Sequence, residues 1–291
     1  MRKKINISDV IIFLIVLVMG LSCLLPLWNV VALSFSDSAS ATANRVRFLP
    51  VNFNLNAYKK IMEDAQFWKS FMISVVRVIL GTVINMLLTI LMAYPLSKSK
   101  KEFRAQGIYM KLAIFAMLFP AGMIPLFMVV KDVGLMDTIW SMIIPAAVPI
   151  GNVILLMNFF RGIPKSLEEA AEIDGASPFQ VLWKVMLPMS LPALATLSLF
   201  CIVGHWNDYF TAILYINRTV NYPLQTYIRQ ITAAFDMSKI TNIELLKQYL
   251  QVSSRNLNSA KIVVSVIPLL LIYPFLQKYF VTGIVMGAVK E

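Results

Sequence analysis

Residues 165–180 read KSLEEAAEIDGASPFQ and place four acidic side chains within seven positions of a mostly apolar chain. The chain has 291 residues, of which 58% are hydrophobic and 14% are charged. Soluble domains carry about 25% charged residues, so this composition predicts an integral membrane protein. The apolar stretches are continuous rather than alternating, which favours membrane helices over a β-barrel or a large soluble core. The acidic stretch therefore requires its own explanation.

Six apolar windows are long enough to cross a bilayer, which takes about 20 helical residues. We place these spans near residues 10–33, 71–96, 109–130, 139–160, 191–216 and 261–281. Prolines inside the windows, such as Pro120 and Pro145, indicate kinks that membrane helices tolerate. The sequence thus predicts an all-α protein with one transmembrane domain over residues 1–291.

The basic residues predict how the spans are oriented. Lys and Arg crowd residues 2–4 and the short segment 98–111 between the second and third spans. Because positive loops stay in the cytoplasm, we expect both termini and the loop 161–190 to be cytoplasmic. This placement of basic residues also explains the net charge of +11 without a nucleic-acid partner.

Two long segments are then external, 36–69 and 217–260. The second is expected to be partly helical at NIELLKQYLQ, residues 242–251. The first span, followed by small residues, resembles a secretory signal. Its apolar run exceeds the roughly 7–15 residues of such a signal, so we expect the helix to be retained.

The acidic loop, residues 161–190, carries a net charge of −1, with three basic and four acidic side chains. Ser166 and Glu169 form an S-x-x-E pattern, which predicts a capping box at the start of a helix reaching residue 174. The acids lie near the helix N-terminus, where the helix dipole favours negative charge. Gly175 predicts a left-handed end to this helix.

Ser177-Pro178 predicts a second helix start, with serine as the cap and proline in the first turn. We expect this second helix to end before Leu187-Pro188. One side of the first helix carries residues at spacings of three and four, namely Leu167, Ala170 and Ala171. The loop therefore reads as helix, sharp turn, helix.

Two interpretations of this form are open: a helix lying on the membrane surface, or an element that docks to another protein. Interfacial helices carry Lys and Arg on the polar face, whereas this helix is acidic and is repelled by anionic lipid. That contrast favours a protein partner.

The stretches EEAAEIDGAS (168–177) and LPMSLPAL (187–194) resemble the EAA loop of permease subunits of bacterial ABC importers. The family pattern is E-A-A, three residues, then G, with L-P further on. The resemblance implies the type I importer permease fold, with six helices and a coupling helix that docks into a groove on an ATPase subunit. The implied coupling residues are Glu168, Glu169, Ala170, Ala171, Asp174 and Gly175.

Within that family the chain looks most like carbohydrate-uptake permeases of the maltose type. HWNDYFTAILYI (205–216) resembles their W-N-D-[FY] segment, and the ending YPFLQKYFVTGIVMGAVKE (273–291) looks like the subgroup for complex oligosaccharides or polysaccharides. Glu291 departs from the pattern, since glycine is common there. The implied partners are a second permease, an extracellular solute-binding protein and two cytoplasmic ATPase subunits that bind ATP and Mg.

The W-N-D segment puts polar side chains at membrane depth, where an unpaired acid costs several kcal/mol. Asp208 should therefore face the bundle interior, near a helix end or a hydrated pathway. Aromatic faces beside amides and carboxylates suit a sugar, so the segment is one candidate for the substrate pathway. A structural hydrogen-bond network is the other interpretation. The pathway candidates are Trp206, Asn207, Asp208, Tyr209 and Asn152.

Other polar residues in the spans carry weaker expectations. Asn85 and Asn158 are lesser candidates of the same kind. Arg77 is expected to snorkel to the outer interface, with lining of the pathway as the alternative. Cys23 and Cys201 lie in apolar runs and are expected to be buried, which disfavours a disulfide or metal site. The single histidine excludes multi-histidine metal sites.

The sequence lacks G-x-x-x-x-G-K-[ST], so it predicts no ATP-binding P-loop, and it lacks the nucleophile-elbow and zinc-protease motifs. We therefore expect a transport subunit without cofactors of its own rather than an enzyme. Two alternatives stay open: an ABC permease for another solute, and a carrier driven by an ion gradient. Such a carrier needs coupling-ion sites, usually in paired repeat halves with broken helices.

Overall fold

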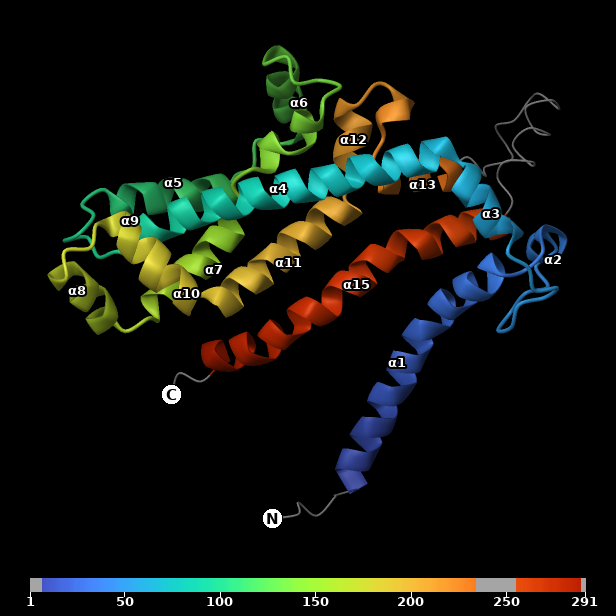
Figure 1. Cartoon of the computed structure of the whole chain (residues 1–291), viewed down its shortest axis with the longest axis horizontal. Coiled ribbons are helices and arrows are strands. Elements are labelled where there is room, and N and C mark those ends of the chain that lie inside the picture. The colour runs from blue at the N-terminus through green and yellow to red at the C-terminus, as the bar shows by residue number, and fades with distance from the viewer. Residues whose placement is uncertain (1–6, 234–254, 289–291) are drawn as a thin grey trace. The chain divides into compact units, whose positions relative to one another are not determined.

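The computed structural model describes residues 7–233 and 255–288, and those residues form helices and connecting segments without a strand (Figure 1). The helix predicted over 242–251 lies outside the described residues. Contacts divide the chain into two compact units. Unit 1 combines Met1–Trp68 with Tyr227–Pro268, and unit 2 combines Lys69–Thr226 with Leu269–Glu291.

Unit 1 begins with the long apolar helix α1, Ile7–Ser34, whose side chains from residue 10 to 28 are exposed or half-buried within this chain. Such an apolar surface needs lipid or another protein around it. The helix leads into a small core of Ala32, Leu33, Ala41 and Val46. The remaining helices of this unit are α2 (Ser38–Thr42), α3 (Asn56–Glu63), most of α13 (Leu224–Ala233) and the first part of α15 (Arg255–Ala288).

A buried lysine joins three segments of unit 1. The Lys261 side chain is 2% exposed, and its Nζ donates to Asp64 Oδ2 at 2.6 Å and to Tyr227 Oη at 2.9 Å. Tyr227 Oη in turn donates to Asp64 Oδ2 at 2.9 Å. A buried charge is tolerated when it is paired and hydrogen-bonded, so this network holds α13 and α15 to the segment before α4.

Unit 2 contains most of α4 (Ala65–Ser97) and the shorter helices that follow it in the chain. These are α5 (Gln106–Leu118), α6 (Met123–Asp132), α7 (Ile150–Arg161), α8 (Lys165–Ile173), α9 (Pro178–Val181), α10 (Leu187–Met189), α11 (Leu191–Asn207) and α12 (Phe210–Tyr215). Short single-turn helices lie at η1 (Ile139–Met142), η2 (Ile144–Ala146), η3 (Leu182–Met186) and η4 (Thr219–Asn221). Figure 1 shows α11 running along α4.

The described residues contain up to six candidate spans, the predicted number, if each bent helix pair counts as one span. Three helices are long and apolar enough by themselves, at Val10–Ser34, Ala65–Ser97 and Arg255–Pro274. Three further spans are pairs bent by 111°, 48° and 83°, namely α5 with α6, Ile139–Ala146 with α7, and Pro178–Met189 with α11. Pro120 and Pro149 lie at two of these breaks, where they cannot continue a helix.

The fifth predicted window, 191–216, is not one helix. It breaks between Asn207 and Phe210. The helix α11 instead forms a bent pair with the segment before it, Pro178–Met189. The prediction that both cysteines are buried is right for Cys201 and wrong for Cys23, which is exposed among the residues that the structure describes.

The largest apolar core of unit 2 joins the end of α4 to α7, to the segment α9–α10 and to α11. Its fully buried members include Ala93, Leu96, Val153, Leu156 and Leu197. The second half of the acidic loop adds Val181, Leu182, Met186 and Leu187 to the same core. This packing anchors one half of the loop and leaves α8 at the surface.

Candidate functional site

The first helix of the acidic loop, α8, begins two residues earlier than predicted. Pro164 is its N-cap residue, and no side chain caps the first turn. The capping box of Ser166 and Glu169 is therefore wrong: Ser166 already lies inside the helix, so its own amide and carbonyl belong to the first turn. The extended backbone of Pro164, with ψ 125°, sets the start instead.

The end of α8 confirms the predicted glycine turn. Gly175 has φ +80°, a left-handed conformation that a residue with a Cβ adopts at a cost. Its N–H donates to the Glu172 carbonyl at 3.0 Å, and the Ala176 N–H donates to the Ala171 carbonyl at 2.9 Å. These two bonds are a Schellman motif, which satisfies the last carbonyls of the helix and fixes the direction of the chain.

The second helix starts at the predicted cap. Gln180 N donates to Ser177 Oγ at 3.4 Å, and Ser177 N donates to Gln180 Oε1 at 2.7 Å, so a reciprocal capping box is present here. The predicted stop before Leu187-Pro188 is wrong, because helical structure continues through η3, a π-helical turn, into α10 and ends at Ser190. Pro188 lies in the first turn of α10, where its missing N–H is tolerated.

The structure separates the six predicted coupling residues into two groups. Glu169, Ala170, Asp174 and Gly175 are exposed. Glu168 is instead bound inside the chain by an ion pair with Lys98, and Ala171 packs against the apolar core. The predicted shared side of Leu167, Ala170 and Ala171 is thus divided, with Leu167 and Ala170 exposed.

The acidic loop also exposes large apolar side chains that sequence reasoning missed. Ile173 is 86% exposed, Phe179 65% and Trp183 54%. They accompany the exposed acids Glu169 and Glu172 on the same loop. Exposed apolar side chains edged by polar groups are typical of a protein interaction surface. The sequence does carry a signal for them, as apolar residues inside a charged loop.

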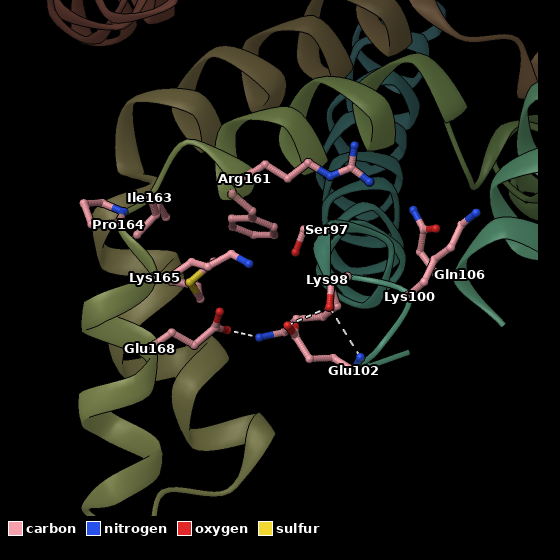
Figure 2. A pocket seen from close by; sticks show the side chains of 13 residues that line it. Ser97, Lys98, Lys100, Glu102, Gln106, Arg161, Ile163, Pro164, Lys165 and Glu168 are labelled. Atoms are coloured by element: carbon pink, nitrogen blue, oxygen red, sulfur yellow. Dashed lines mark hydrogen bonds and ion pairs between the residues drawn. The ribbon is translucent and has the colours of Figure 1, made fainter. Parts of the chain in front are cut away.

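A pocket of about 370 Å³ lies at the start of α8, between the end of α7 and the segment that follows α4 (Figure 2). Lys98 and Glu168 point toward one another across it and form the ion pair. A hydrogen bond of 2.8 Å from the Ser99 hydroxyl holds the pKa of Glu102 below its usual range. Burial lowers the pKa of Lys98.

A second polar cluster lies in the membrane-spanning part of unit 2. The Arg77 side chain is 1% exposed and forms an ion pair with Asp208. Its Nη1 donates to the Asp208 carbonyl at 2.9 Å, and its Nη2 donates to Thr211 Oγ1 at 3.0 Å. The expectation that Arg77 snorkels is therefore wrong, because an acid from a distant part of the chain neutralises it in place.

Asp208 lies at the break between α11 and α12 and faces the interior, as expected of an acid at this depth. Its Oδ1 accepts from Phe210 N at 2.9 Å and from Thr211 N at 3.2 Å, and its Oδ2 accepts from Arg77 and Thr211. Both carboxylate oxygens are thus occupied by protein donors, and the carboxylate caps α12 as an N-cap side chain does.

The neighbours of Asp208 differ in exposure. Trp206 is buried and its ring meets Phe71 edge to face at 5.8 Å between centroids. Asn207 is exposed, and the Tyr209 carbonyl accepts from Thr226 Oγ1 at 2.9 Å. These residues are pathway candidates that share one helix break.

The predicted asparagines have separate partners. Asn85 Oδ1 and His205 Nε2 are 2.6 Å apart, and Asn85 Nδ2 donates to the Ala146 and Ala147 carbonyls at 2.7 and 2.9 Å. Asn152 Nδ2, on α7, donates to Cys201 Sγ, on α11, at 3.4 Å. Asn85 therefore ties α4 to α11 and to η2.

Comparison with known proteins gives consistent matches over nearly all of the chain. The family described as binding-protein-dependent transport system inner membrane component matches residues 85–285. The polygalacturonan/rhamnogalacturonan transport system permease protein of Bacillus subtilis is 40% identical, over 99% of each chain.

Two solved structures are similar. One is a chain of a bacterial ABC transporter involved in the import of the acidic polysaccharide alginate, with TM-score 0.84 and 34% identity, covering 96% of this chain and 100% of that one. The other belongs to a bacterial alginate ABC transporter in complex with an alginate pentasaccharide-bound periplasmic protein. It has TM-score 0.56 and 15% identity, covering 92% and 93%, and shows likeness of fold alone.

Proposed function

The chain belongs to the binding-protein-dependent transport system inner membrane components, and on that premise we propose that it is a carbohydrate-specific permease subunit of an ABC importer. The observation that carries the proposal is the 40% identity, over 99% of both chains, to a polygalacturonan/rhamnogalacturonan permease. The chain is a multi-pass membrane protein with the predicted type I importer permease fold.

We propose an acidic oligosaccharide as the substrate class. Of the similar proteins, one serves polygalacturonan or rhamnogalacturonan transport and another belongs to an alginate importer. Polygalacturonan and alginate are both uronic-acid polymers. Fragments carrying several carboxylates are therefore the first substrates to test, with neutral glucose oligomers as the comparison.

In the proposed assembly this chain pairs with a second permease, and two cytoplasmic ATPase subunits bind ATP and Mg. An extracellular solute-binding protein delivers the sugar; the second similar structure is itself a transporter bound to a periplasmic protein that holds an alginate pentasaccharide. Because the sequence has no P-loop motif, the energy of ATP must reach this chain from outside.

The acidic loop is the proposed contact with an ATPase subunit. Its exposed acids Glu169 and Asp174 and its exposed apolar residue Ile173 offer a binding surface. The Glu168–Lys98 ion pair connects α8 to the end of α4, and the apolar core connects α9 and α10 to α7 and α11. Movement imposed on α8 is thereby passed to the membrane helices.

Within the membrane, we propose that Asp208 holds the α11–α12 break while its neighbours face the sugar. Asn207 is exposed and offers an amide to sugar hydroxyls, and the half-buried Tyr209 provides aromatic surface nearby. Trp206 is buried against Phe71 and supports the break from behind. Asn152, on α7, contacts Cys201 of α11 and is assigned to the same proposed pathway.

Uptake of radiolabelled oligogalacturonate by a deletion strain, with and without the restored gene, tests this function. We expect restored uptake that vanadate inhibits, and co-purification of an ATPase with the tagged chain. Neutral maltooligosaccharide should not compete. Uptake abolished by ionophores but resistant to vanadate would point to an ion-driven carrier and overturn the proposal. Vanadate-sensitive uptake of a neutral sugar alone would overturn only the acidic substrate class.

A further inference from the structure

The pocket at the start of α8 lies where two membrane-spanning elements end. Span Ala65–Ser97 and the bent pair that finishes at Arg161 both terminate in residues that line it. A pocket at the ends of spans is at the depth of the lipid headgroups, and the positive-inside rule puts it on the cytoplasmic side.

Basic side chains outnumber acids in this pocket. Lys98, Lys100, Arg161 and Lys165 line it together with Glu102 and Glu168. Figure 2 shows Lys98, Lys165 and Glu168 around the same space, with Lys100 at its edge beside Gln106. Both acids have protein partners: Glu168 pairs with Lys98, and Glu102 accepts from the Ser99 hydroxyl and lies within electrostatic range of Lys98 and Lys165.

Two of the four basic side chains are already engaged by described residues of the protein, and two are not. Arg161 Nη2 donates to the Leu96 carbonyl at 2.9 Å, and Lys98 is held by Glu168. Lys100 and Lys165 have no side-chain hydrogen bond or ion pair to any residue within the described part of the chain. The pocket thus has a net positive charge with two lysines free to bind an anion.

An apolar groove of about 320 Å³ lies beside the pocket along α4. Leu91, Tyr94 and Pro95 line it from α4, and Pro178, Phe179 and Leu182 line it from the second helix of the acidic loop. Lys98 Nζ lies 4.6 Å from the centroid of the Tyr94 ring, so a basic wall and an apolar wall meet there. Going toward the end of α4, apolar lining gives way to basic lining.

We propose that the basic pocket binds the phosphate of an anionic phospholipid, with an acyl chain in the apolar groove. Basic pockets at the cytoplasmic ends of membrane helices are suited to such headgroups. Free phosphate offers the same charge, but it has no use for an apolar groove and no reason to favour the end of a span. Because Lys165 and Glu168 belong to α8, a bound headgroup braces α8 against α4.

The test is lipid retention by the whole transporter, purified as the complex and examined by native mass spectrometry. The complex is supplied with equal phosphatidylglycerol and phosphatidylcholine, and we expect phosphatidylglycerol to be retained preferentially. Removing both free charges in Lys100→Gln/Lys165→Gln should lower that preference about 5-fold per lysine, since a basic residue near the surface is worth about 1 kcal/mol. Lys100→Arg/Lys165→Arg should keep it.

The control is Lys111→Gln, which removes one exposed charge from α5 outside the pocket. Equal retention of both lipids, or equal effects of the control and the double variant, would overturn the proposal. Displacement of phosphatidylglycerol by millimolar inorganic phosphate would show a free-phosphate site instead. Lipid retention that appears only after the ATPase subunits are stripped from the complex would show that the pocket is a protein interface. None of these readouts depends on which sugar is transported.

Discussion

Arg77 and Asp208, which lie 131 residues apart in the chain, form a buried ion pair that ties α4 to the break between α11 and α12. Each is the sole Lys, Arg, Asp or Glu in its predicted membrane window. A charge at membrane depth is tolerated when it is paired with an opposite charge, so each residue explains why the other is present in a membrane span. The pair shows how a helix can break in the middle of a predicted span without leaving an unpaired charge there.

Replacing one partner of this pair should cost far more than replacing both. Asp208→Leu leaves the buried Arg77 charge unpaired, with an expected loss of about 3–5 kcal/mol in the free energy of unfolding. Arg77→Leu leaves the half-buried Asp208 carboxylate unpaired and should cost somewhat less. Arg77→Leu/Asp208→Leu should lose less than either single variant, apart from about 1 kcal/mol for the lost cap on α12. SDS titration of the purified complex measures the three values, and additive losses would contradict the ion-pair account.

The pairing also marks the limit of sequence reasoning on this chain. The spans follow from apolar windows of sufficient length, because the bilayer sets that length for any sequence. The sequence predicts that Arg77 snorkels because a single sequence reports the charge of a residue but not its distant partner. The positions of Asp64, Tyr227 and Lys261 have the same property: three separated segments converge on one network that no local pattern encodes.

The acidic loop shows the opposite case, since its local signals are largely sufficient. Gly175 and Ser177 act over four or five neighbouring residues, and the structure confirms the predicted role of both. The errors concern Ser166 and Pro188, where two local signals compete. Pro164 takes the N-cap position from Ser166, and tertiary packing carries the second helix through Pro188.

The two neighbouring acids of α8 should have different effects on mutation. Glu168 binds Lys98, whereas Glu169 is exposed. Glu168→Lys should cost about 1 kcal/mol of stability, and Lys98→Glu/Glu168→Lys should restore it by reversing the pair. Thermal unfolding of the complex measures both.

Glu169→Lys should leave stability and membrane insertion unchanged but weaken ATPase association more than tenfold, because a reversed charge at an interface costs several kcal/mol. The amount of ATPase that co-purifies with the tagged chain is the measurement. Normal ATPase association and normal uptake in this variant would contradict the assignment of Glu169 to the interface.

The substitutions tolerated at Gly175 should be limited by its backbone conformation rather than by the space around it. A Cβ there meets nothing within 4 Å, yet φ is +80°. Gly175→Val should destabilise the turn by about 1–2 kcal/mol and lower uptake. Gly175→Asn should retain most uptake, because asparagine enters the left-handed region more readily. Equal uptake by the two variants would contradict the conformational explanation.

Unit 1 should lose stability in acid through Asp64. Burial acts to raise its pKa, but the Lys261 hydrogen bond and charge, with the Phe67 amide, outweigh this and hold the pKa of Asp64 below its usual range. A depressed pKa stabilises the fold above the unfolded value of about 3.9, and that contribution is lost as pH falls through the lower folded value.

The stability difference between wild type and Asp64→Asn should therefore shrink as pH falls from about 6 to about 3. Unfolding measured across this range gives the difference at each pH. Asp132→Asn, at an exposed acid that ends α6, removes a carboxylate outside this network and is the control. A constant difference for Asp64→Asn would mean that the carboxylate charge contributes nothing to unit 1.

Gly81 should tolerate no side chain, because α4 and α11 approach closely there. A Cβ on Gly81 would lie 2.4 Å from His205 Nε2, and that nitrogen is held by Asn85 Oδ1 at 2.6 Å. Gly81→Ala should therefore push the ring away from Asn85 and cost about 1–3 kcal/mol of stability. His205→Ala introduced on that background should relieve the clash and cost less than it does alone. Gly204→Ala, in the same α11 with nothing within 4 Å of a new Cβ, should be neutral or stabilising. SDS titration of the four variants settles whether this close approach, rather than helix propensity, keeps glycine at position 81.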